Sequence, residues 1–89
     1  VKREYVHHPV YKGHELKSAI KMDLVVMLQR GNVIIECKAI SAIGYQERKQ
    51  TFGYLRGTGF PIAILVNFGA QHRAEIERYF CKNNIITPF

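Results

Sequence analysis

The segment VIIECKAI, from Val33 to Ile40, is an apolar run that two opposite charges interrupt. A run rich in valine and isoleucine is typical of a β-strand with little exposed surface. Side chains alternate between the two faces of a strand, so Glu36 and Lys38 share one face and Cys37 lies on the other. Removing a lone charge from water is costly on such a strand. Glu36 and Lys38 therefore indicate an ion pair, a metal site or a cleft.

A second apolar run, Met22 to Leu28, precedes this segment and contains a single acid, Asp23. The four residues from Gln29 to Asn32 separate the two runs. Within them, Gly31 and Asn32 are the residues best able to adopt a positive φ in a tight turn. The pattern predicts a β-hairpin.

The length of the hairpin loop decides which face Asp23 occupies. A loop of two or four residues gives opposed residues whose numbers sum to an odd value, for example Asp23 opposite Lys38 or Val25 opposite Glu36. Asp23 then shares a face with Glu36 and Lys38, near enough for both carboxylates to reach one cation. A three-residue loop would break this parity.

Length and composition predict one domain that spans residues 1–89. The chain has 89 residues and is 47% hydrophobic, which suffices for one core. Because it begins at Val1, we expect it to be an N-terminally truncated fragment of a longer protein. Cys37 and Cys81 have no metal-binding spacing and form no disulfide framework. Nothing resembles a signal peptide or a membrane span, so we expect a cytoplasmic protein without a membrane partner.

The net charge points toward a polyanionic partner. Thirteen Lys and Arg oppose seven Asp and Glu, which gives a net charge of +6. Nucleic acid is the common partner of such a surface, although many small basic proteins bind none.

The order of predicted elements is three strands, a helix, a strand and a helix. Together they make an α+β domain with a mixed sheet, in which the first three strands form an antiparallel meander. Cys37 is expected to be buried with Ile35, Ile64 and Val66. The predicted strands are Arg3–Tyr11, Leu16–Leu28, Val33–Ile40 and Ile62–Asn67, and the predicted helices are Tyr45–Arg56 and Ala70–Lys82.

Several segments between His7 and Gly69 resemble one nuclease family. They are HHPVYKGHEL, MDLVV, VIIECKAI, QTFGYLRGTG and ILVNFG. These segments are similar to the GxxExxR family of the PD-(D/E)xK nuclease superfamily. Met22 stands where a proline is common, and the GxxExxR helix itself would precede Val1. The resemblance implies a restriction-endonuclease-like core that lacks its first helix.

The resemblance also implies roles for particular residues. Asp23 and Glu36, with the carbonyl oxygen of Cys37, would hold Mg²⁺, or Mn²⁺ in its place. Lys38 would position the attacking water and offset the charge that develops on the phosphate. Gln50 resembles a helix glutamine found near the active site in part of the superfamily. The alternative is a cross-strand cluster of ion pairs with Gln50 as an ordinary surface residue.

Basic residues on or beside the first predicted helix are candidates for binding nucleic acid. Arg48, Lys49 and Arg56 lie there with Tyr45 and Tyr54, and they could follow a phosphate backbone. A solvated helix face explains the same residues.

Three functions stay open from the sequence. The leading one is a metal-dependent nuclease that acts on DNA, with RNA as a second candidate substrate. The second is a nucleic-acid-binding module of the same fold without turnover. The third is an oligomeric interaction domain, for example a homodimer that uses its sheet edges.

Overall fold

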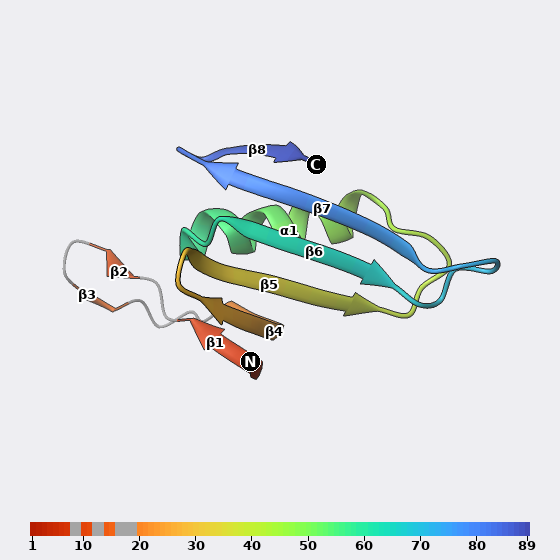
Figure 1. Cartoon of the computed structure of the whole chain (residues 1–89), viewed down its shortest axis with the longest axis horizontal. Helices are drawn as coiled ribbons and strands as arrows, with labels where there is room; N and C mark the ends of the chain where they lie inside the picture. Colours follow the sequence, from red (N-terminus) through yellow and green to blue (C-terminus); the bar gives the residue numbers. More distant parts are fainter. Residues whose placement is uncertain (8–9, 12–13, 16–19) are drawn as a thin grey trace.

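The computed structural model describes residues 1–7, 10–11, 14–15 and 20–89. In this part of the chain, a six-stranded sheet carries one helix on one of its faces, and a small two-stranded hairpin lies apart (Figure 1). The helix is α1 (Tyr45–Thr58), and the small hairpin pairs β2 (Val10–Tyr11) with β3 (His14–Glu15). In spatial order, the sheet contains β1 (Lys2–His7), β4 (Ile20–Leu28), β5 (Gly31–Lys38), β6 (Ile62–Asn67), β7 (Glu75–Lys82) and β8 (Ile85–Pro88).

The sheet is mixed, as predicted for an α+β domain. Strands β5 and β6 are parallel, and α1 forms the crossover between them. The other four neighbouring pairs are antiparallel. A parallel pair needs a long connection, and here the helix supplies it.

A two-residue turn joins β4 to β5. Leu28 pairs with Gly31, so Gln29 and Arg30 form the loop. Gly31 has a φ of 132°, and a side chain there would also collide with Pro61. Glycine is therefore required at this position.

The register of this hairpin confirms the predicted parity but not the illustrated partners. Val25 pairs with Ile34, so the numbers of opposed residues sum to an odd value. The examples of Val25 opposite Glu36 and Asp23 opposite Lys38 were wrong by two residues. The illustrated partners belong to a four-residue loop. The loop has two residues, and this shifts β5 along β4 by two residues.

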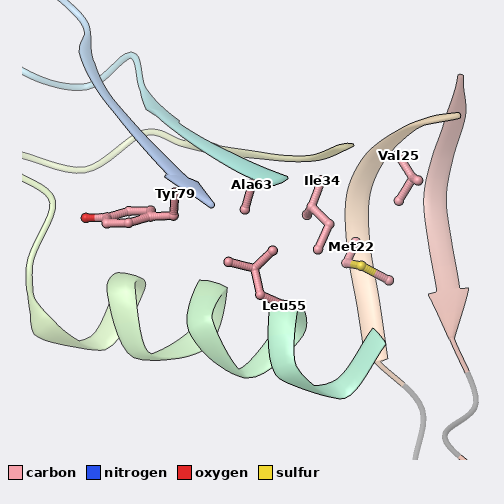
Figure 2. Close-up of a cluster of buried hydrophobic side chains, with 6 residues drawn as sticks. All are labelled: Met22, Val25, Ile34, Leu55, Ala63 and Tyr79. Carbon is pink, nitrogen blue, oxygen red and sulfur yellow. The ribbon is translucent and has the colours of Figure 1, made fainter. Parts of the chain in front are cut away.

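The hydrophobic core lies between α1 and the face of the sheet that α1 covers. Figure 2 shows Leu55 projecting from the helix toward the side chains of the sheet. Its partners in the buried cluster come from β4, β5, β6 and β7, and they are Met22, Val25, Ile34, Ala63 and Tyr79.

The expected burial of Cys37 was wrong. Cys37 is exposed, and Ile35, Ile64 and Val66 are only half-buried. These side chains lie on the sheet face opposite to α1. No described element covers that face, so the apolar side chains there keep part of their contact with solvent.

The second predicted helix was also wrong. The segment Ala70–Lys82 contains the strand β7, whose side chains alternate between a half-buried or buried face and an exposed one. Asn83 and Asn84, which directly follow the predicted helix, have φ values of 54° and 63°. Two consecutive residues with positive φ make the tight turn of a β-hairpin, and this turn leads into β8.

The boundaries of the other elements differ modestly from the predictions. Helix α1 ends at Thr58 and is capped by Gly59, which has a φ of 74° and whose N–H donates to the carbonyl oxygen of Leu55 at 2.9 Å. The first predicted strand is divided between β1 and β2. The second strand begins at Ile20, and the predicted part covering residues 16–19 lies outside the described residues.

Candidate active site

Asp23 and Glu36 lie side by side, just beyond the last paired residues of β4 and β5. The backbone N–H of Asp23 donates to Oε1 of Glu36 at 3.0 Å. In return, the backbone N–H of Cys37 donates to Oδ2 of Asp23 at 3.0 Å. Each side chain thus bonds to the opposite strand at the point where the sheet ladder stops. These reciprocal hydrogen bonds fix both carboxylates and leave the second oxygen of each without a hydrogen bond to a described residue.

The environment of Glu36 disfavours its negative charge. Its exposed fraction is 3%. Burial raises the pKa of Glu36, and the neighbouring charge of Asp23 raises it further, while the hydrogen bond from the Asp23 amide and the charge of Lys38 lower it. The net effect is a raised pKa, so a cation at this point would stabilise the ionised pair.

Lys38 does not form an ion pair with either carboxylate. All three residues are described, and no N–O distance of an ion pair joins Lys38 to Asp23 or Glu36. The ammonium group instead donates to Oε1 of Gln50 on α1 at 2.8 Å. The cross-strand ion-pair cluster is therefore not the arrangement found, although the charge of Lys38 still lowers the pKa of Glu36.

The amide and carbonyl groups of Cys37 point toward β4, where Asp23 lies. In an extended strand the N–H and C=O groups of one residue point toward the same neighbouring strand. The Cys37 amide bonds to Asp23 of β4, so its carbonyl oxygen also points toward β4. The next carbonyl, of Lys38, points the other way and accepts from the Phe68 amide at 2.8 Å.

These donors fit a hard divalent cation. The site offers two carboxylates and one carbonyl oxygen, which are the ligand types that Mg²⁺ and Mn²⁺ prefer. The described residues contain no group of three or more His, Cys, Asp and Glu side chains able to hold a metal. Mg²⁺ usually keeps several waters and needs only one or two carboxylates, so the small donor set suits it.

Tyr54 is a residue of this site that the sequence analysis placed only among the phosphate-following side chains. Burial raises the pKa of Tyr54, and the charges of Glu36 and Asp23 raise it further. The negative charges of both carboxylates therefore act on the phenol of Tyr54. The signal was its position four residues after Gln50, because residues at this spacing share a helix face.

Tyr54 and Gln50 also line a hollow beside the site. The hollow has a volume of about 480 Å³. Its other lining residues come from the same helix and are Gln46, Lys49 and Gly53. The hollow therefore runs along the side of α1 that carries Gln50.

The predicted basic residues are not brought to the carboxylates. Arg48 binds Glu77 of β7 through two hydrogen bonds of 2.9 and 2.7 Å. That hydrogen bonding raises the pKa of Arg48 and lowers the pKa of Glu77. Lys49 and Arg56 are exposed on α1, and Nε of Arg56 donates to the carbonyl oxygen of Asn84 at 3.5 Å.

Asn67, which the sequence analysis placed only at the end of a predicted strand, holds the loop that follows β5. It is fully buried. Its Oδ1 accepts from the amides of Ile40 and Gly69 at 3.0 Å, and its Nδ2 donates to Glu75 at 2.8 Å. The same Glu75 oxygen accepts from the Ile43 amide at 2.9 Å. The side chains of β6 and β7 thus anchor residues 39–44, which connect Lys38 to α1.

Gly69 allows this loop to approach closely. A Cβ atom at Gly69 would lie 2.5 Å from the backbone N and O atoms of Ile40. Backbone atoms cannot yield as a flexible side chain does, so only glycine fits there.

Comparison with known proteins shows the superfamily of this chain. The fold is a mixed sheet with carboxylates on two adjacent strands and a lysine two residues beyond the second carboxylate. A family model described as the PD-(D/E)XK nuclease superfamily matches residues 1–79, and the chain belongs to this superfamily. No curated protein and no solved structure gave a match.

Membership of this superfamily indicates a nuclease-like function with nucleic acid as the class of substrate. Nucleases of the superfamily generally use divalent metal ions, in keeping with the oxygen donors of the site. Among the described residues, no helix has the length and apolar character needed to cross a membrane.

Proposed function

We propose that this domain catalyses metal-dependent hydrolysis of phosphodiester bonds in DNA, as a member of the GxxExxR group of the superfamily. One observation carries the proposal. Asp23 and Glu36 are locked side by side by reciprocal backbone hydrogen bonds, while Lys38 is held by Gln50 and pairs with neither. Two adjacent carboxylates that form no ion pair with a described residue favour binding of a metal ion.

Asp23, Glu36 and the Cys37 carbonyl oxygen would hold Mg²⁺. When bound, the ion polarises the phosphate and lowers the pKa of a bound water. Lys38 carries a positive charge beside this point and can orient the attacking water or stabilise the charge that develops on the phosphate. Gln50 accepts a hydrogen bond from Lys38, so it fixes where the ammonium group points.

The first prediction concerns metal binding to the intact chain. Mg²⁺ or Mn²⁺ at millimolar concentration should raise the melting temperature, because a ligand that binds only the folded state stabilises it. Asp23→Asn should abolish this rise and abolish plasmid cleavage. Without metal the variant should be as stable as the parent or slightly more stable, since one of two adjacent charges is removed. Thermal melting with and without Mg²⁺ measures both effects.

Lys38→Ala separates binding of the metal from the chemical step. It should keep the Mg²⁺-dependent rise in melting temperature and lose plasmid cleavage, because Lys38 is not among the metal donors. Arg78→Ala, which removes a positive charge from the opposite face of the sheet, is the control and should keep both properties.

Two results would contradict the proposal. If Mg²⁺ and Mn²⁺ leave the melting temperature of the parent unchanged, Asp23 and Glu36 do not form a metal site. If the parent binds metal but cuts neither DNA nor RNA, the domain is a binding module of the nuclease fold. Cleavage of RNA alone would correct the proposed substrate.

The homodimer and the cytoplasmic location stay predictions. Sedimentation equilibrium tests the first, since a dimer doubles the mass of 10.3 kDa.

A further inference from the structure

A second hollow lies on the other flank of α1. It has a volume of about 400 Å³. Tyr45, Arg48, Lys49, Phe52 and Arg56 line it. Lys49 lines this hollow and the one beside the candidate active site, so its side chain stands on the ridge of α1 between the two. A nucleic-acid strand that crosses this ridge would pass from one hollow to the other.

The second hollow presents aromatic rings next to positive charge. Tyr45 has an exposed fraction of 74%, and Nζ of Lys49 lies 6.0 Å from the centre of its ring. Phe52 forms a fixed wall, because its ring packs edge-on against Tyr79 with centroids 4.8 Å apart. An exposed ring beside a cation is the combination with which proteins stack a base and bind its phosphate.

The positive charge of this hollow belongs to Lys49 and Arg56. Glu77 binds the guanidinium of Arg48 through two hydrogen bonds and neutralises it. Within the described residues, no carboxylate forms an ion pair with Lys49 or Arg56. Their charges are therefore available to a polyanion, which the net charge of +6 also favours.

We propose that the hollow formed by Tyr45, Phe52, Lys49 and Arg56 binds an unpaired base, and that the substrate is a single-stranded or locally unpaired nucleic acid. In a duplex each base is stacked on both faces, so its ring cannot lie against Tyr45 unless the strand is opened. In a single strand the bases are free to stack on protein rings. The inference rests on the proposed function only in assuming a nucleic-acid substrate.

Binding is measured with fluorescently labelled DNA of one sequence, as a single strand and as a duplex, in EDTA so that no cleavage occurs. Fluorescence anisotropy should show tighter binding of the single strand. Tyr45→Ala should weaken that binding by about 5- to 100-fold, the usual effect of removing a stacking ring. Tyr45→Phe keeps the ring and should bind as the parent does. Because Tyr45 is exposed, neither change should unfold the domain.

A matched pair of variants tests whether the net positive charge alone explains binding of the single strand. Lys49→Ala should weaken binding of the single strand, whereas Lys82→Ala, on the far face of the sheet, should not. Equal affinity for single strand and duplex, or equal losses for both on Tyr45→Ala, would overturn the proposal. No loss with Tyr45→Ala would overturn it as well.

Failure of this proposal is distinguishable from failure of the proposed function. Cleavage of duplex DNA with metal, combined with no effect of Tyr45→Ala, rejects the hollow and keeps the nuclease. Preferred binding of the single strand that depends on Tyr45, combined with no cleavage, keeps the hollow and rejects catalysis.

Discussion

At the scale of single residues, Glu36 is the group whose charge the fold tolerates least. It is buried beside Asp23 and has no ion-pair partner among the described residues. Its backbone hydrogen bond offsets this only in part, because its pKa is still raised. Such a carboxylate lowers the stability of the metal-free protein and contributes to function when a cation binds.

The pH dependence of stability tests this description. Because the pKa of Glu36 is raised in the folded state, its contribution to stability is fully present below its unfolded pKa and is lost as pH rises through the folded pKa. Glu36→Gln removes that loss while keeping an acceptor for the Asp23 amide. In EDTA, the variant should therefore be more stable than the parent at pH 8, by a few degrees in melting temperature.

The difference between Glu36→Gln and the parent should shrink as pH falls from the raised pKa of Glu36 toward the ordinary pKa of glutamate, and it should be absent below that ordinary pKa. Urea unfolding of both proteins from pH 4 to pH 8 measures it, and other titrating groups cancel in the comparison. A variant less stable than the parent at pH 8 would show that Glu36 acts as a paired structural charge.

The sequence made the proximity of Asp23 and Glu36 predictable, because the expected hairpin puts them on adjacent strands and its parity puts them on one face. It did not reveal the partner of Lys38. That contact depends on the position of α1 across the sheet, which is set by packing of Leu55 rather than by any local pattern. The pairing of Arg48 with Glu77 could not be predicted either. Glu77 lies 29 residues away, on a strand that we expected to be a helix.

At the scale of secondary-structure elements, the helix predicted over Ala70–Lys82 shows where local patterns mislead. Its apolar residues fit a helix period loosely, but Glu75, Glu77 and Tyr79 alternate with exposed side chains along β7. The two acids on that side have partners supplied by α1 and β6, which are Arg48 and Asn67. Tertiary contacts of this kind decide between helix and strand, and they are invisible in a short window.

The loop between β5 and α1 should lose its anchor when Asn67 is replaced. Asn67→Ala removes three hydrogen bonds from a fully buried position. It should lower the free energy of unfolding by about 2–3 kcal/mol, since the amides of Ile40 and Gly69 and the carboxylate of Glu75 lose their partner. Cleavage should fall as well, because the loop sets the position of Gln50 relative to Lys38. Urea unfolding and plasmid cleavage measure the two effects.

Phe68→Ala is the control for Asn67→Ala. Phe68 lies between Asn67 and Gly69 and has an exposed fraction of 68%. Its removal should change the free energy of unfolding by less than about 0.5 kcal/mol. Equal effects of the two substitutions would show that Asn67 has no special part in holding the loop.

At the scale of the whole molecule, the two faces of the sheet differ in kind. One face carries α1 and the buried core (Figures 1 and 2). The carboxylates lie on the same face, and two hollows are lined by residues of the helix that covers it. The opposite face keeps half-buried and exposed apolar side chains, among them Ile76 and Phe80. Functional groups are thus collected on one side, which is the side where we expect nucleic acid to bind.

This asymmetry predicts where positive charges contact phosphate. Each phosphate contact releases counterions, so the logarithm of the binding constant falls with the logarithm of salt concentration, by about 0.7 per contact on a single strand. If Lys49 contacts a phosphate, Lys49→Ala should reduce the steepness of that fall by about 0.7. Arg56→Ala should do the same. Anisotropy titrations of single-stranded DNA at several NaCl concentrations in EDTA give the slopes.

Lys82→Ala removes one positive charge from the opposite face and serves as the reference. It should leave the slope unchanged, although it lowers the net charge of the protein by the same amount as Lys49→Ala. If all three substitutions reduce the slope equally, the +6 charge acts on nucleic acid as a diffuse field. If only Lys49 and Arg56 matter, phosphates follow the ridge of α1 between the two hollows, because these side chains have no protein anion to bind within the described residues.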